Sequence, residues 1–369
     1  MLLIKVFIVI VCFVGRDRLN TTMKHYQYWN QLSDVAKMTI SKGLKTRGLT
    51  RWEFLDLSKH DEDIQIHDLE RWKTICEDRN IDPATVIIDD NNLNYKWVSD
   101  NYGFKSNYFP NELLKIKSNE VVPPCADVIP TTNLNFMAGN YHSNRYKLLE
   151  HLWSNDLLTD DTKLMWTSYR DHLSVPDGIH QTKMVSSEFL EFMASNTPRT
   201  FMGDTFYNKY PEEIDLGTSE QVYVDDYNKQ DMWIYEKSLV SVVLDTMSCW
   251  PNKDEPPYSP TKYTTPKSFK AIKHKRPFII TIGKSGGDLP ALRNLGFETF
   301  DSVWDESYDT LPYHKRLDQI GNLCYNLSNE NTTELYHATR DICEHNYNVL
   351  VNTDWAEWYL QELDKQYDI

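Results

Sequence analysis

The sequence is poor in the patterns that mark metal-binding or disulfide-rich proteins. Its six cysteines are scattered, and no Cys-x-x-Cys pair occurs. Cys343 and His345 are too close together in the chain to be half of a zinc finger, so this class of zinc site is excluded. We expect free thiols in a reducing compartment, and therefore a cytoplasmic protein.

Long apolar segments are also scarce. Residues 2–14 are almost wholly apolar, but Lys5 interrupts them and they are too short to cross a bilayer comfortably. They have no small-x-small cleavage site and no basic n-region, which a signal peptide would have. We favour a buried strand here. The alternative left open is a short anchor that associates the protein with a membrane.

Basic residues are outnumbered, since 39 Lys and Arg face 54 Asp and Glu, for a formal net charge of −15. A general nucleic-acid-binding protein needs an extended basic face, so that class is excluded. A P-loop is absent as well. Gly283, Lys284 and Ser285 follow an apolar run, but Phe278 occupies the position of the first P-loop glycine, which excludes a Walker-type nucleotide triphosphatase.

The chain of 369 residues is long enough for two domains with separate cores. We predict an α/β domain over 1–130, a second over 131–330, and a helical tail over 331–369 that packs across both. Strand-like runs at 84–88, 133–137 and 240–244 alternate with helical patterns such as 144–158. This alternation favours an α/β fold.

One short segment contradicts the acidic character of the chain. Between positions 262 and 276 there are six Lys or Arg and His274, with no Asp or Glu. Thr265 is a good N-cap and Pro266 suits the first helical position, so we predict a helix that begins there and a strand over 278–282. The positive end of the helix would lie beside Lys267, which predicts a phosphate or diphosphate site. The alternative is a solvated, lysine-rich helix.

The order of motifs in this half of the chain resembles a known family. Thr265-Pro266-Lys267, a short helix, a Pro-Phe-Ile strand, Leu-Gly-Phe-Glu-Thr-Phe and Trp-Asp-Glu-Ser-Tyr-Asp follow one another, and Asn140 precedes Arg145 in an Asn-x-x-x-x-Arg segment upstream. Over roughly 135–327 this is similar to glycosyltransferase-like proteins of large phages and algal viruses, and distantly to α1,3-fucosyltransferases of the two-domain GT-B type. A viral source would make the host cytoplasm the expected location.

The resemblance implies an α/β protein of two facing Rossmann-like domains. It also implies a metal-independent transfer of a sugar from a nucleotide-sugar donor to a glycan or other hydroxyl acceptor, without a cofactor. Arg145 and Lys267 match the basic residues that contact the donor diphosphate. The other implied donor-binding residues are Asn140, Thr264, Thr265, Lys270 and Gly283. Pro266 stands where the fucosyltransferases have a Glu, which supports an alternative: an inactive relative that binds sugar or protein as a viral component.

Acidic residues supply the remaining candidates. Asp89 and Asp90 follow the predicted strand 84–88 and are candidates for the general base that deprotonates the acceptor. With Asp225-Asp226 they also keep open a metal-dependent transferase of the single-domain GT-A type. The acidic run Asp305, Glu306 and Asp309 is interpreted as a solvated loop that caps the next helix.

Overall fold

The computed structural model describes residues 32–51, 66–89, 95–107, 110, 113–114, 128–138, 143–155, 163–166, 186–189, 232–244, 266–280 and 288–369. It divides into two compact units. The first comprises the described residues within Met1–Glu120 together with Asp354–Ile369. The second comprises those within Val121–Glu255 and Pro260–Thr353. Both contain parallel sheets with helices, which confirms the α/β prediction.

The first unit is built on a three-stranded sheet of order β1-β2-β3, with β1 (Thr50–Arg51), β2 (Val86–Asp89) and β3 (Lys105–Asn107). Helices α3 (Ile66–Asp78) and α4 (Tyr95–Tyr102) accompany it, and the 3-10 helix η3 (Pro83–Thr85) precedes β2. A continuous apolar core joins α3 to the sheet through Leu69, Trp72, Cys76, Val86, Ile88, Val98 and Phe104. Burial of these apolar side chains stabilises the unit.

The last helix of the chain belongs to this first unit. Helix α16 (Trp355–Tyr367) packs against α2 (Asp34–Thr46), and an added Cβ on Gly43 would collide with Leu360. Arg47 donates two hydrogen bonds of 2.5 Å to the Asp364 carboxylate, which hold the pKa of Asp364 below its ordinary value. The Tyr367 hydroxyl donates to the Ser106 carbonyl at 2.7 Å, so the end of α16 is bound to β3.

The second unit contains a four-stranded parallel sheet of order β5-β4-β6-β7. Its strands are β4 (Thr132–Ala138), β5 (Lys163–Trp166), β6 (Ser238–Leu244) and β7 (Phe278–Ile280). The central strand β6 carries Val240, Val242 and Val243, all fully buried, as expected for a strand covered on both faces. The sequence predicted β4, β6 and β7 to within two residues at each end.

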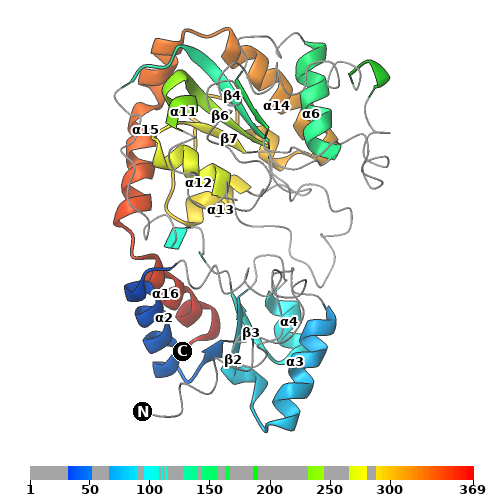
Figure 1. Ribbon diagram of the computed structural model, residues 1–369, viewed down its shortest axis with the longest axis vertical. Coiled ribbons are helices and arrows are strands. Elements are labelled where there is room, and N and C mark those ends of the chain that lie inside the picture. Colours follow the sequence, from blue (N-terminus) through cyan, green and yellow to red (C-terminus); the bar gives the residue numbers. More distant parts are fainter. Residues whose placement is uncertain are drawn as a thin grey trace, which may run out of the picture. The chain divides into compact units, whose positions relative to one another are not determined.

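Helices cover both faces of this sheet. Figure 1 shows α6 (Ser143–Ser154) and α14 (Tyr313–Ser328) on one side, and α12 (Pro266–Lys273) and α15 (Thr332–Asn352) on the other. The close approach of α14 to α6 requires glycine, because a Cβ on Gly321 would collide with the His151 ring. The second unit also contains α11 (Met232–Lys237), α13 (Asp288–Asn294) and the 3-10 helix η5 (Ser307–Thr310).

No helix among the described residues combines the length and the apolar character needed to cross a membrane. Residues 2–14, for which a strand or an anchor was predicted, lie outside the described residues.

Candidate functional site

The two edges of the four-stranded sheet define the geometry of the second unit. All four strands are parallel, so Ala138 pairs with Leu244 and Val243 with Ile280 near one edge, here called the carboxyl edge. The opposite edge, called the amino edge, holds the strand starts at Thr132, Ser238 and Phe278. A helix that connects two parallel strands runs back along the sheet, so α6 and α12 begin at the carboxyl edge.

The direction in which successive strands are added to the sheet reverses between β4 and β6. The chain passes from β4 through α6 to β5 on one side, and from β6 through α12 to β7 on the other. Crossovers of this kind are right-handed almost without exception, so the two helices cover opposite faces. In open α/β sheets, ligands bind outside the carboxyl ends of the strands at such a reversal. The carboxyl edge at β4 and β6 is therefore the candidate site.

Two of the residues predicted from the sequence lie at this edge. Arg145 is the third residue of α6, which follows β4, and Lys267 is the second residue of α12, which follows β6. Helix α12 begins at Pro266, as predicted from its N-cap and proline pattern. Both cations thus belong to the first turns of the two helices that flank the reversal, although they are 122 positions apart in sequence.

The other predicted residues fall mostly in the segments that join strands to helices. Asn140, Thr264, Thr265, Gly283 and the Asp225-Asp226 pair lie outside the described residues, as do the side chains of Arg145 and Lys267. In the first unit, Asp89 is the last residue of β2, at the carboxyl end of that strand, while Asp90 and the Asp89 side chain lie outside the described residues.

Much of the remaining positive charge of the cationic segment is buried. Lys270 is 8% exposed, Lys273 6% and Arg276 1%. The Arg276 guanidinium donates to the carbonyls of Tyr235 at 2.6 Å and Val128 at 2.8 Å, and it lies over the Tyr336 ring. The alternative of a solvated, lysine-rich helix is therefore wrong for Lys270 and Lys273, whose side chains are buried. These charged side chains are part of the packing of the fold. At the amino edge, Arg276 contacts three other segments through Tyr235 of α11, Val128 before β4 and Tyr336 of α15.

His274 and Lys275 of this segment also contact the fold, while Lys262 lies outside the described residues. His274 is buried and stacks on Tyr235, with ring centroids 4.3 Å apart. Burial, together with the charges of Lys273, Lys270 and Arg276, lowers the pKa of His274 to about 3, so its ring is neutral at pH 7. Lys275 forms a 2.5 Å ion pair with Glu344 of α15. These contacts hold the end of α12 against the rest of the second unit, and they do not form a ligand site.

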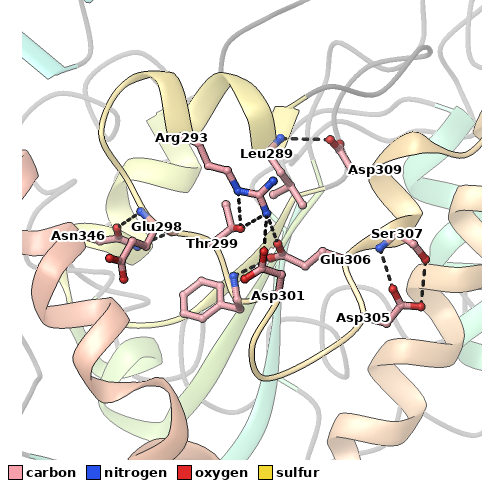
Figure 2. A network of polar contacts seen from close by, with 11 residues as sticks. Leu289, Arg293, Glu298, Thr299, Asp301, Asp305, Glu306, Ser307, Asp309 and Asn346 are labelled. Atoms are coloured by element: carbon pink, nitrogen blue, oxygen red, sulfur yellow. Dashed lines mark hydrogen bonds and ion pairs between the residues drawn. The ribbon is translucent and has the colours of Figure 1, made fainter.

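A second polar cluster holds the loop between α13 and η5 (Figure 2). Arg293, near the end of α13, donates to the Thr299 hydroxyl at 3.0 Å and contacts Asp301 at 3.3 Å and Glu306 at 3.1 Å. The buried Glu306 also accepts a 2.8 Å hydrogen bond from the Phe300 N–H. Burial raises the pKa of Glu306, and hydrogen bonding from the Thr299 side chain and the Phe300 N–H, together with the charge of Arg293, opposes the rise. The cluster fixes the course of the chain from α13 to η5.

The interpretation of the acidic run as a solvated loop is wrong for two of its three members. Glu306 and Asp309 are buried, and Asp309 accepts from the Leu289 N–H at 3.3 Å, so it caps the preceding helix α13. Asp305 is exposed and accepts from the N–H and hydroxyl of Ser307, at the start of η5. Sequence reasoning missed the role of Arg293. Arg293 and Glu306 are 13 positions apart in the sequence. Helix and strand periodicities relate only nearby positions, so no local pattern pairs these two residues.

Other reactive groups among the described residues do not form a separate centre. The free thiols of Cys76, Cys324 and Cys343 are buried, and burial raises the pKa of Cys324 to about 12. Within the described part of the chain, no group of three or more His, Cys, Asp or Glu is arranged to hold a metal ion.

Comparison with known proteins gives no relative: no family model, curated protein or solved structure matches this chain.

Proposed function

We propose that this chain is a glycosyltransferase-like protein that transfers a sugar from a nucleotide-sugar donor to a hydroxyl acceptor, with the donor diphosphate at the carboxyl edge of the four-stranded sheet. One observation carries the proposal. The two helices that flank the strand-order reversal each begin with a basic residue in the first turn, Arg145 in α6 and Lys267 in α12. A reversal of this kind is the usual ligand position in α/β proteins.

The chemistry of sugar transfer explains why cations are needed at helix starts. The leaving group is a nucleoside diphosphate, on which negative charge accumulates as the sugar departs. The first N–H groups of a helix have no partner inside the helix, and the helix dipole is positive there. Arg and Lys charges beside them would stabilise the leaving group without a metal ion. Metal independence is accordingly part of the proposal.

We assign the acceptor side to the first unit, as in glycosyltransferases of the two-domain GT-B type. Asp89 is the last residue of β2, and Asp90 follows it. A carboxylate at the carboxyl end of a parallel strand is well suited to accept the proton of an acceptor hydroxyl. We propose this pair as the source of the general base.

Thermal-shift measurements with a panel of nucleoside diphosphates and nucleotide-sugars test the proposal. Each ligand is added with EDTA and, separately, with Mn²⁺. A ligand at a hundred times its Kd stabilises the folded protein by about 2.7 kcal/mol, which is readily measured. We expect Arg145→Ala and Lys267→Ala to weaken binding. The matched control is Lys237→Ala, because Lys237 is an exposed cation at the amino edge of the same sheet.

The outcomes separate the alternatives. Binding in EDTA that is lost in the Arg145 and Lys267 variants and kept in the Lys237 variant supports the proposal. Binding that requires Mn²⁺ would favour a metal-dependent enzyme. No binding of any nucleotide would favour an inactive relative, and Pro266→Glu is then the reversion to measure first.

A further inference from the structure

The second unit has a surface groove whose lining includes none of the residues assigned to the candidate donor site. The groove has a volume of about 590 Å³ and runs between α14, the start of α15 and the turn that holds Trp304. Asn133, the second residue of β4, donates to the carbonyls of Leu327 and Glu330, each at 2.7 Å. Because Leu327 and Glu330 line the groove, this part of it adjoins the amino edge.

The distance from the donor site follows from the strand length. β4 has seven residues, which at about 3.3 Å per residue gives a separation of roughly 20 Å between the two edges of the sheet. The end of the groove at Leu327 and Glu330 therefore lies at the edge of the sheet opposite the helix starts, and none of the residues assigned to the donor site lines the groove.

The charge of the groove excludes an anionic ligand. Its polar lining consists of the amides of Gln319, Asn322 and Asn326 and the carboxylates of Asp305, Glu330 and Glu334. No Lys or Arg is among the described residues that line it. Uncompensated carboxylates repel phosphates and other anions, and they attract hydrogen-bond donors.

The amide groups form a ridge along one face of α14. Gln319, Asn322 and Asn326 are three and four residues apart, a spacing that aligns side chains on a helix. Each amide can both donate and accept a hydrogen bond, as can each hydroxyl group of a sugar. The repeated pairing of donor and acceptor along the ridge is complementary to a ligand that carries several hydroxyls.

One end of the ridge is already oriented by the protein. The Gln319 amide donates to the Asp305 carboxylate at 2.9 Å and to the Ser307 hydroxyl at 2.7 Å. Hydrogen bonds from the Ser307 N–H and hydroxyl lower the pKa of Asp305, so its carboxylate is an ionised acceptor at neutral pH. Groups held in place before binding lose less conformational entropy when a ligand arrives.

Apolar side chains form the rest of the lining. Leu323, Leu327 and Leu335 line the groove with Trp304, which is 7% exposed and stacks on Phe300. An aromatic ring beside amides and carboxylates also suits the mixed apolar and polar faces of a sugar ring.

We infer that the groove between α14 and α15 binds an uncharged, hydroxyl-rich ligand, namely a neutral saccharide unit of a glycan. This site is independent of the proposed donor site. It would hold a glycan on the second unit at a distance from the reacting atoms, as an anchoring site does.

The test uses saturation-transfer NMR and a neutral glycan array on the full chain. The soluble probes are glucose, galactose, mannose and N-acetylglucosamine, with glucuronic acid and tetralysine as charged comparators. We expect a neutral saccharide to bind, and glucuronic acid to bind more weakly than glucose. The double variant Asn322→Ala/Asn326→Ala should weaken binding about tenfold or more, because it removes two paired donors and acceptors.

Two control variants make the result specific. Asn348→Ala removes an exposed amide of α15 that does not line the groove, and it should bind the saccharide as the wild type does. Arg145→Ala/Lys267→Ala should also keep saccharide binding while losing nucleotide binding, so the two proposals can fail separately. The inference is overturned if no neutral saccharide binds, if the double variant binds normally, or if tetralysine binds and sugars do not. The last result would identify an acidic surface for basic peptides.

Discussion

The two edges of the four-stranded sheet differ in how the fold uses their polar groups. At the amino edge, Arg276 bridges the Tyr235 and Val128 carbonyls, and the Asn133 amide bonds two carbonyls near the start of α15. Thr131 and Lys237 add a backbone hydrogen bond of 3.0 Å. At the carboxyl edge, helices begin, with their first N–H groups and with Arg145 and Lys267. One edge thus supplies stability, whereas the other has the features of a binding site.

The comparison shows that cations close together in the sequence can have different roles. Lys267 and Arg276 belong to the same short segment, but Lys267 lies in the first turn of α12 and Arg276 follows its last turn, so they lie at opposite edges of the sheet. Variants at the two edges should therefore separate stability from binding.

The largest effect is expected for Arg276→Met. This change removes a buried charge and leaves two carbonyls without their donor, so the free energy of unfolding should fall by about 3–5 kcal/mol. Urea denaturation measures it. Lys237→Met, an exposed cation at the same edge, is the control and should change stability by no more than about 0.5 kcal/mol. A loss of less than 1 kcal/mol for Arg276→Met would contradict the assignment of the amino edge to stability.

A smaller loss is expected for Asn133→Ala. The Asn133 amide donates two hydrogen bonds of 2.7 Å, and its carbonyl accepts from the Thr332 hydroxyl. Removal of the side chain should lower the free energy of unfolding by about 2–3 kcal/mol, because buried partners lose their bonds. The comparison variant is Asn348→Ala in exposed sequence of α15, which should unfold as the wild type does. Equal stability of both variants would show that the hydrogen bonds of the Asn133 side chain do not stabilise the fold.

Acid should weaken the region around His274. The pKa of His274 is lowered from 6.5 to about 3 in the fold, so the unfolded chain binds more protons between these values. Stability is therefore lost as the pH falls below 6.5, by up to about 1.4 kcal/mol per pH unit. His274→Phe keeps a ring beside Tyr235 and should flatten this acid dependence. Denaturation curves at pH 7 and pH 5 measure the difference, and parallel behaviour of variant and wild type would rule out His274 as the cause.

The smallest effect on stability is expected at the carboxyl edge. Arg145→Ala and Lys267→Ala should each change the free energy of unfolding by less than about 0.5 kcal/mol, because cations that serve a ligand contribute little to the packing of the fold. Calorimetric unfolding without added nucleotide measures this. A loss of several kcal/mol would mean that these cations have the same structural role as Arg276, and the difference between the edges would disappear.

Regular local patterns made much of the fold predictable. The strand starts and ends at β4, β6 and β7, the beginning of α12 at Pro266 and the alternation of strands and helices could be read from neighbouring residues. These features depend on backbone propensity, capping and apolar runs, which operate over a few positions. For the same reason, the placement of Arg145 and Lys267 at helix starts could be anticipated from the sequence.

The sequence by itself determined the local elements, the scarcity of cysteine and of long apolar runs, and the charge contrast between the cationic segment and the rest of the chain. Tertiary structure alone decided which of those charges are buried, because α15 and α11 bring Tyr336 and Tyr235 to Arg276 and His274 from distant positions. It also decided that Glu306 meets Arg293 and that the amides of α14 face a groove. Burial depends on contacts between remote segments, and no local pattern encodes them.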